Sequence, residues 1–468
     1  MQDKSALPAD PAPETDAEGD SLERSLKLPQ SITVVTGGII GVSIFLVPAS
    51  VANTAGHPIL ALSVWIIAGI LSACAALTYA ELGAAMPQTG GIYVFLKKGY
   101  GRIFGFFYGW MVMCGYGAAA LAIVAIMASG YALRILPSDF AGQASGTLVA
   151  IGFIVISGAA NLLGIAKSGN LQFVLTVVKV GLILILIALP LGAGHLDLAV
   201  FGMAPNPALD APGIAKALSE GLLLTLFSYS GAHFATQIAG EIKNPARNIP
   251  RAIFYGFGIV LGLYLMLNTT IITTLPFETF RYSDAVAVDL MELALGPIGA
   301  YFVAISIMIS ALAVLNAQLM SYPRVVFALA RDRLMPQWIA DIHPVTHAPW
   351  VAVVAVALIS VLYILSGSYQ TILAAVAFIS HSFTTLAVAA VFVFRRKYPD
   401  MPRPYKVTFY PYAPAAFILF SIVYLGMLLV TRTWESIAGI AIVASGLPVY
   451  LFMRPKAKAQ EAELAAAE

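Results

Sequence analysis

The chain has 468 residues, of which 59% are hydrophobic and only 11% charged, and its mean hydropathy is +0.86. Soluble domains carry about 25% charged residues, because a surface in water needs polar cover. The composition therefore excludes a soluble protein and predicts an integral membrane protein surrounded by the lipid bilayer. A formal net charge of +2 provides no basic field, so we expect no nucleic-acid partner.

Apolar runs of about 20 residues, the length that crosses a bilayer as a helix, recur along the chain. The twelve predicted spans lie near residues 32–54, 58–84, 103–133, 147–164, 170–192, 214–239, 250–275, 295–329, 350–366, 370–394, 413–431 and 436–453. We therefore expect an all-α membrane protein with twelve transmembrane helices in a domain of residues 28–454. The acidic segment 1–27 is predicted to be a disordered cytoplasmic tail, and residues 455–468 a second cytoplasmic tail.

The positive charges between the spans are strongly one-sided, which predicts the orientation in the membrane. If the N-terminus is cytoplasmic, the inner side carries 21 of the 26 Lys and Arg residues, and Lys179 lies within a span. The outer side carries only Arg134, Lys216, Arg281 and Arg432. Both termini are thus predicted to be cytoplasmic, in the cell membrane. Glu81 and Glu241 fall at cytoplasmic helix ends, where pairing with a nearby Arg or Lys is their ordinary role.

Two predicted spans are interrupted by small and polar residues. The first contains TGGIIGVSIF at residues 36–45, and the sixth contains FSYSGAH at residues 227–233. Close helix packing through glycine is one explanation. However, two broken helices at matching positions of two five-helix blocks are typical of an inverted-repeat transporter with its site at the midplane. The freed N–H and C=O groups need partners inside the membrane, and a zwitterion such as an α-amino acid supplies both kinds.

Lys179 is the one lysine well inside a predicted span, in the run LTVVKVG. An ionisable group at this depth is costly and indicates a functional role. The alternative is snorkelling to an interface, but Lys179 lies about ten residues from either end of its span. An ammonium here can take the place of a bound monovalent cation by donating to exposed carbonyls. His233 has either a substrate or proton role or a structural one, whereas His381 is expected to be structural.

Motifs of other chemistries do not occur in the sequence. There is no GxxxxGK[ST] phosphate loop, no HExxH, no GxSxG and no carboxylate pair within a predicted span. The first three motifs are typical of ATP-hydrolysing proteins, zinc hydrolases and serine hydrolases, respectively. We therefore expect a protein that is not an enzyme and has no metal or cofactor.

Five motifs, in order, resemble those of the amino acid–polyamine–organocation (APC) superfamily of transporters, in particular the branch of L-type amino acid transporters and their bacterial relatives. The resemblance runs from about Leu28 to about Tyr450. With the similar family patterns in parentheses, the motifs are GGIIGVSIF followed by Pro48 (GxIIGSGIF…P), YAELG through PQTGGIY (YAELG…P-x-S/T-GGEY), FSYSGAHFATQIAGEIKNPARNIPR (FAYxGW…EExKNPxRNIPR), Leu315-Asn316 with RVVFALARDRLMP (VNG…SR…A-R-D/E-G-x-L-P), and RRKYPDMPRPYKV (RRKxPxxxRPYKV).

The resemblance implies a LeuT-type fold with two inverted repeats of five helices, residues 32–192 and 214–394, followed by two helices in 413–453. It places the substrate carboxylate on the amides of Val42 and Ser43. It places the substrate amine on the carbonyls of Ile39, Phe227 and Ser230, and the ring of Phe227 as a gate over the pocket. Gly41, Ser228 and His233, in the same two breaks, complete the predicted substrate site. Lys179 corresponds to the buried lysine of span 5 in members without a sodium site. The resemblance implies that it bridges towards spans 1 and 8 and takes part in coupling.

The sequence departs from the family pattern at the site. Val42 stands where the family usually has Ser or Thr, and Ser43 where it usually has Gly. Ala232 replaces a Trp common in L-type members, His233 replaces an Asn, Asp or Glu, and Ile92 replaces a Glu. A side chain at Ser43 narrows the break and favours small substrates.

We therefore expect a secondary active transporter of small neutral L-amino acids, independent of sodium and working by exchange or proton coupling, as a monomer or weak homo-oligomer. A cationic amino acid or polyamine antiporter is the alternative. No acidic residue lies in the predicted pocket, and a buried cation needs a carboxylate partner, so neutral substrates are favoured. A membrane-embedded enzyme or receptor is a more remote alternative.

Overall fold

The computed structural model describes residues 22–135, 143–203, 211–366 and 369–455. Within these ranges the chain forms helices joined by turns and loops, and the one β-type pairing is an isolated bridge between Leu26 and Ile242. The predicted all-α fold is confirmed. The predicted tails lie mainly outside the described residues, but Leu26, at the end of the first, is buried.

The first half of the chain alternates long apolar helices with shorter ones. The helices are α1 (Leu28–Ile39), α2 (Ser43–Ala55), α3 (Pro58–Ala85), α4 (Ile92–Tyr100), α5 (Arg102–Cys114), α6 (Tyr116–Ile135), α7 (Gln143–Leu162) and α8 (Ile165–Gly192). The second half contains η2 (Leu198–Gly202), α9 (Ala211–Ser228), α10 (Phe234–Gln237), η3 (Ala239–Glu241), α11 (Pro245–Thr274), α12 (Phe277–Phe280), α13 (Val286–Leu295), α14 (Ile298–Arg331), η4 (Gln337–Ala340), α15 (Trp350–Ser366), α16 (Tyr369–Lys397), α17 (Tyr412–Thr431) and α18 (Thr433–Ser445).

Every predicted span falls on a helix or on a pair of consecutive helices. By length and apolar composition, nine helices of the described residues can cross a membrane, or ten if α1 and α2 form one bent span. α15 is apolar but shorter. The multi-pass membrane fold is therefore established, and the count of twelve spans stays a prediction.

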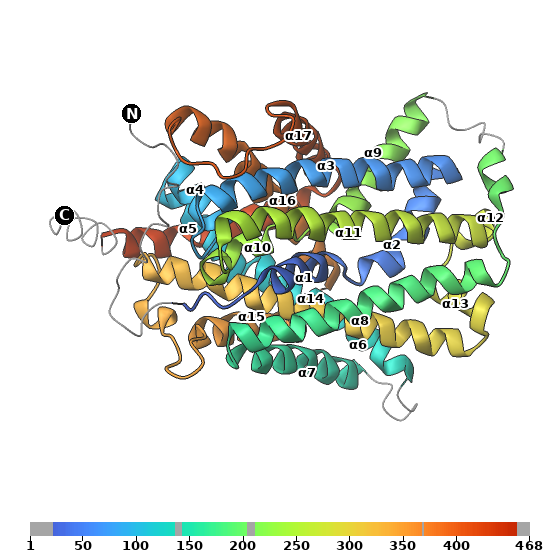
Figure 1. The fold of residues 1–468 in the computed structure, drawn as a ribbon, viewed down its shortest axis with the longest axis horizontal. Coiled ribbons are helices and arrows are strands. Elements are labelled where there is room, and N and C mark those ends of the chain that lie inside the picture. The colour runs from blue at the N-terminus through green and yellow to red at the C-terminus, as the bar shows by residue number, and fades with distance from the viewer. Residues whose placement is uncertain (1–21, 136–142, 204–210, 367–368, 456–468) are drawn as a thin grey trace, which may run out of the picture.

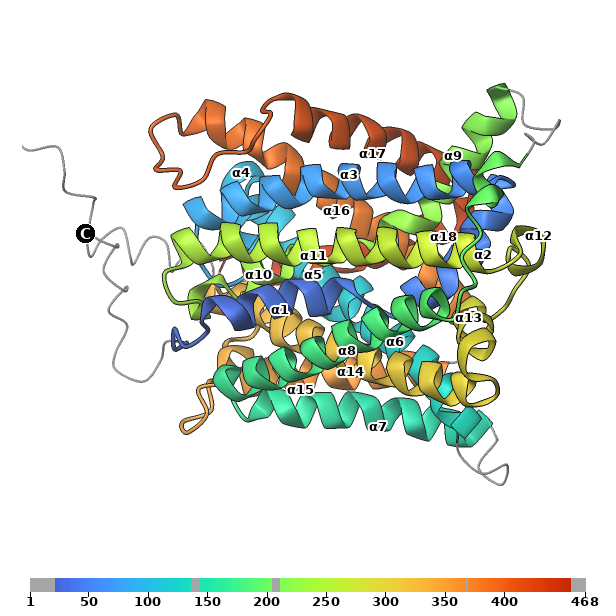
Figure 2. The ribbon, with the colours of Figure 1, turned by 45° about the vertical axis from the view of Figure 1, so that its right-hand side comes forward.

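The two five-helix blocks pair through their second, third and fourth spans. The second spans, α3 and α11, lie side by side (Figures 1 and 2), and the third and fourth spans pair as α6 with α14 and α7 with α15. Each block also has short helices after its second span. Figure 1 shows α4 at one end of the molecule and α12 and α13 at the opposite end. This opposed placement is what an inverted repeat requires.

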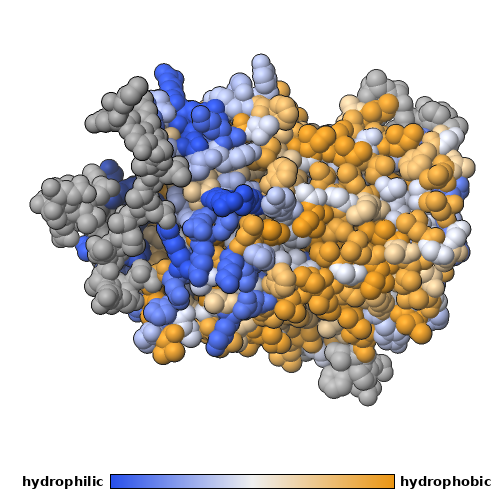
Figure 3. Space-filling model, in the orientation of Figure 1, coloured by the Kyte–Doolittle hydropathy of each residue, from blue (hydrophilic) through white to orange (hydrophobic). Residues whose placement is uncertain are grey.

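Charged and polar side chains gather at one end of the molecule. Figure 3 shows this hydrophilic end on the left, where α1 begins, and an apolar surface over the remaining length of the face in view. The apolar belt is the surface expected of a protein in contact with lipid.

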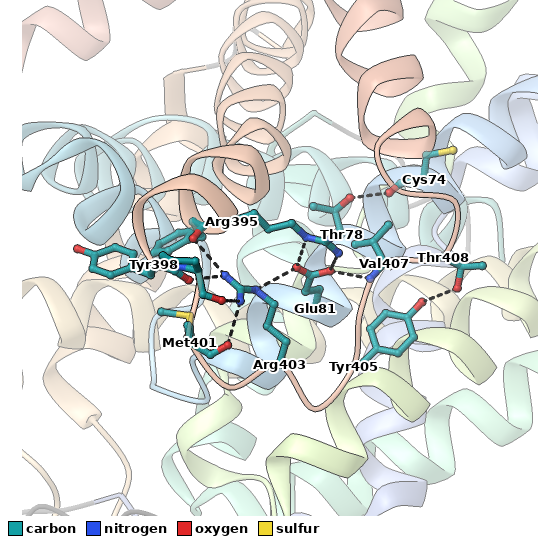
Figure 4. A network of polar contacts seen from close by, with 12 residues as sticks. Cys74, Thr78, Glu81, Arg395, Tyr398, Met401, Arg403, Tyr405, Val407 and Thr408 are labelled. Carbon is teal, nitrogen blue, oxygen red and sulfur yellow. Dashed lines mark hydrogen bonds and ion pairs between the residues drawn. The ribbon is translucent and has the colours of Figure 1, made fainter.

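Ion pairs join the two blocks at the hydrophilic end. Figure 4 shows Glu81, at the end of α3, accepting two hydrogen bonds from Arg395 of α16, of 3.0 and 2.6 Å. The backbone N–H of Val407 donates to the same carboxylate at 2.6 Å, and Arg403 lies 3.6 Å from it. The Glu81 side chain is 1% exposed. The pairing expected for this glutamate is confirmed.

A second ion pair is fully buried. Arg324 of α14 donates from Nε and Nη2 to the two carboxylate oxygens of Glu241, at 3.0 and 3.1 Å, and both side chains are 0% exposed. The backbone carbonyl of Glu241 accepts from the N–H groups of Ser25 and Leu26 at 3.1 and 3.0 Å. Glu241 thus joins three elements: the segment before α1, the short helices after the sixth-span break, and α14.

We expect Arg324→Ala to lower the free energy of unfolding by about 3–5 kcal/mol, because it leaves a buried carboxylate unpaired. The double variant Glu241→Leu/Arg324→Met removes both charges and should recover much of this loss. Thermal unfolding of the detergent-purified protein measures both effects. Arg281→Ala is the control, because Arg281 pairs with Glu278, whose side chain is 62% exposed. Equal destabilisation by the Arg281 and Arg324 variants would contradict the expectation.

Candidate functional site

A cavity of about 300 Å³ lies between the two broken helices. Its wall includes seven of the eight residues predicted to bind substrate: Ile39, Gly41, Val42, Ser43, Phe227, Ser230 and His233. The eighth, Ser228, does not line it. The structure therefore brings the two breaks, almost 190 residues apart in sequence, to the same space.

The first break separates α1 from α2. α1 ends at Ile39, Ile40 has extended backbone angles (φ −69°, ψ 93°), and α2 begins at Ser43 with a bend of 42° between the helices. The first amides of a helix have no acceptor within the helix, and they carry its partial positive charge. The start of α2 at the cavity can therefore bind an anionic group.

The second break follows α9, which ends at Ser228, and precedes α10, which begins at Phe234. Gly231 has φ 134°, a conformation open essentially to glycine. A Cβ atom here would lie 3.1 Å from the carbonyl carbon of Gly38 and 3.2 Å from its oxygen. Glycine at this position therefore allows the two breaks to touch.

Lys179 of α8 holds the end of α1. Its Nζ donates to the carbonyl oxygens of Gly37 and Ile40, each at 2.7 Å, and the residue is 1% exposed. The hydroxyl of Ser310 on α14 donates to the Ile40 carbonyl at 3.1 Å. Lys179 lies behind α1 rather than in the cavity wall. Lys179 therefore contacts the first break directly, and it is linked to α14 because Ser310 donates to the same Ile40 carbonyl.

Tyr264 of α11 bridges the two breaks and was not predicted from the sequence. Its hydroxyl lies 3.1 Å from the carbonyl oxygen of Ile39 and 3.1 Å from that of Ser228, so it can donate to either. Its ring packs edge-on against Trp65 at 5.8 Å. The one sequence signal is a hydroxyl-bearing residue inside the apolar run LGLYLML.

The predicted residues of the second break differ in their surroundings. Phe227 is 41% exposed and lines the cavity, as a gating ring must. The Ser228 side chain is buried away from the cavity, and its carbonyl is the group that Tyr264 contacts. His233 is 7% exposed, lies between Tyr79 and Phe234, and its Nε2 has no hydrogen-bond partner among the described residues.

The cavity wall is apolar with a few neutral polar groups. From the breaks it extends along α2, α6 and α9, away from the end of the molecule where α4 lies in Figure 1. Gln318, Ser380 and three tyrosines contribute polar atoms, and no Asp, Glu, Lys or Arg is among the described residues of the wall. Clusters of three or more His, Cys, Asp or Glu that could hold a metal are absent from the described part of the chain.

Comparison with known proteins places this arrangement in context. The family model described as amino acid permease matches residues 26–447. The serine/threonine exchanger SteT of Bacillus subtilis (strain 168) is 30% identical over 444 residues, 94% of this chain and 99% of that protein. Large neutral amino acids transporter small subunit 2 of Mus musculus is 30% identical over 94% of this chain and 84% of its own. The human cystine/glutamate transporter is 27% identical over 92% of this chain and 85% of its own.

We expect Gly231→Ala to lower the free energy of unfolding by about 2 kcal/mol or more, because the added Cβ meets the Gly38 backbone at a φ that alanine avoids. Gly258→Ala in α11 is the matched control, since a Cβ there meets nothing within 4 Å and alanine favours the helix. Thermal unfolding in detergent measures both. A Gly231→Ala protein as stable as the wild type would show that the breaks are not in tight contact.

Proposed function

The chain belongs to the amino acid permease family of the APC superfamily, and from this premise we propose that it exchanges small neutral L-amino acids across the cell membrane without sodium. The observation that carries the proposal is the cavity between two facing helix breaks, with Lys179 bound to the carbonyls of the first. It is thus a transporter and not an enzyme.

The two breaks suit the two charged groups that all amino acids share. We assign the substrate carboxylate to the amides of Val42 and Ser43, at the start of α2, where the helix dipole favours an anion. We assign the amine to the carbonyls of Ile39, Phe227 and Ser230. A carbonyl oxygen accepts two hydrogen bonds, so Ile39 can bind an ammonium while it accepts from Tyr264.

Neutral substrates fit the charges of the cavity. A cationic amino acid or polyamine would bring a second positive charge into a wall without carboxylates among its described residues, and an unpaired buried charge is costly. We expect the substrate to have a small side chain because Ser43, which lines the cavity beside the first break, narrows it where the family usually has Gly. SteT, a relative of 30% identity, is named a serine/threonine exchanger, which supports small substrates.

Exchange is favoured over proton coupling for two reasons. The printed name of SteT is that of an exchanger. In addition, the described residues that line the two cavities of His233 include no Asp or Glu, so a proton bound there would lack a counter-ion among them. Uptake into proteoliposomes that depends on internal amino acid supports exchange, whereas uptake driven into empty vesicles by a pH gradient supports proton coupling.

We place both termini in the cytoplasm, with tails 1–27 and 455–468 on either side of the transporter domain 28–454. The support is the uneven loop charge and the single hydrophilic end in Figure 3. The cavity then extends towards the outer face, while the ion pairs of Glu81 and Glu241 close the cytoplasmic face. We propose a monomer or weak homo-oligomer as the working unit.

Lys179→Ala should abolish transport while the protein still folds in detergent, and wild-type uptake should be unchanged when sodium is replaced by potassium or choline. The ammonium satisfies the carbonyls of Gly37 and Ile40, so a sodium ion there would be redundant and repelled. Lys179→Arg should not restore activity, because a planar guanidinium needs more room than an ammonium.

The measurement is initial uptake of labelled amino acid into proteoliposomes. Lys406→Ala, which removes an exposed lysine, is the control for loss of positive charge alone. Strict sodium dependence of the wild type, or near-normal uptake by Lys179→Ala, would remove Lys179 from the mechanism.

A further inference from the structure

A second, smaller cavity adjoins the first at the break of the sixth span. It has a volume of about 70 Å³ and is enclosed by α3, residues 226–233, α16 and α17. The two cavities share Phe227, Ser230, His233 and Ser380. No residue of α1 or α2 is among the described residues that line the smaller one. It is therefore a side pocket of the space to which the proposed function assigns the amino acid backbone.

Two buried polar atoms in the wall of this side pocket form no hydrogen bond of good geometry with a described residue. They are Nε2 of His233 and the hydroxyl of Tyr79, on residues 7% and 3% exposed; the Thr384 side chain is the neighbour close enough to interact with the Tyr79 hydroxyl. Their rings pack edge-on with centroids 6.0 Å apart. Buried polar atoms are nearly always hydrogen-bonded, so this pair indicates a ligand group or water in the pocket.

The opposite wall is fixed in place. Nε2 of His381 is bonded to the Ser421 hydroxyl at 3.0 Å, and the His381 ring packs against Tyr424 at 4.4 Å. Ser380 and Thr384 add hydroxyl groups on the same helix. The described lining residues therefore offer imidazole and hydroxyl groups but no carboxylate, ammonium or guanidinium. Such a wall suits an uncharged polar group and leaves a charged one without a counter-ion.

We propose that this side pocket binds the uncharged polar end of the substrate side chain, a hydroxyl or a carboxamide, through His233 and Tyr79. The inference rests on the proposed function, since it requires the amino acid backbone at the two breaks. A neutral imidazole and a phenol each accept or donate one hydrogen bond as needed, so together they match either group. The pocket, of about 70 Å³, is much smaller than the adjoining cavity of about 300 Å³, so it suits the small polar end of a side chain.

The test compares pairs of amino acids of nearly equal shape, threonine with valine and asparagine with leucine. Competition against labelled substrate in proteoliposomes should favour the polar member of each pair at least about tenfold in the wild type, since a site built for a hydrogen bond discriminates against analogues that lack it. Tyr79→Phe and His233→Leu should bring this ratio close to one, and His233→Gln, which keeps a polar end, should retain part of it.

Tyr363→Phe is the matched control, because it also removes one tyrosine hydroxyl, bonded at 2.7 Å to the Cys114 carbonyl outside both cavities. Its ratio should equal that of the wild type. If a His233 variant does not fold, Tyr79→Phe alone decides the test. An unchanged ratio in Tyr79→Phe, with amino acids still taken up, would mean that the pocket holds water only, and the inference would be wrong. A wild type that takes up no amino acid would instead refute the proposed function, and the inference with it.

Discussion

The cavity between the two breaks depends on how the backbone at the end of α1 is hydrogen-bonded where the helix stops inside the membrane. Gly37 and Ile40 are buried, and the ammonium of Lys179 donates a hydrogen bond to the carbonyl oxygen of each at 2.7 Å. An unsatisfied carbonyl in the membrane interior costs several kcal/mol. The lysine therefore makes the break possible, and the break supplies the amides and carbonyls of the site.

The second break depends on the first. Gly231 fits against the Gly38 backbone because it has no side chain, and the Tyr264 hydroxyl lies within hydrogen-bond distance of the Ile39 and Ser228 carbonyls. The position of the cavity thus follows from contacts that the backbone makes at the two breaks. Side chains such as Ser43, Phe227 and His233 then line a space whose position is already fixed, which allows one family to serve different substrates.

Lys179 and the two breaks could be predicted because polar or flexible residues inside apolar runs are costly and therefore conspicuous in sequence. The spans followed from their length and apolarity, and their number stays a prediction. Ser228 was assigned to the site by resemblance, but its side chain lies away from the cavity. Tyr264 and the His233–Tyr79 pair were missed because their role depends on which helices pack together. The sequence around a tyrosine in an apolar run does not indicate which distant residue its hydroxyl contacts.

The central claim is that the two breaks bind the carboxylate and amine of one amino acid. The most direct test is a thermal-shift screen of the purified protein in sodium-free buffer over the twenty amino acids. The best ligand is then compared with its carboxamide and with its deaminated acid. The intact amino acid should stabilise the protein by about 2.7 kcal/mol at a hundred times its Kd, and either analogue at the same concentration should stabilise it little or not at all. Equal stabilisation by an analogue that lacks one charged group would contradict it.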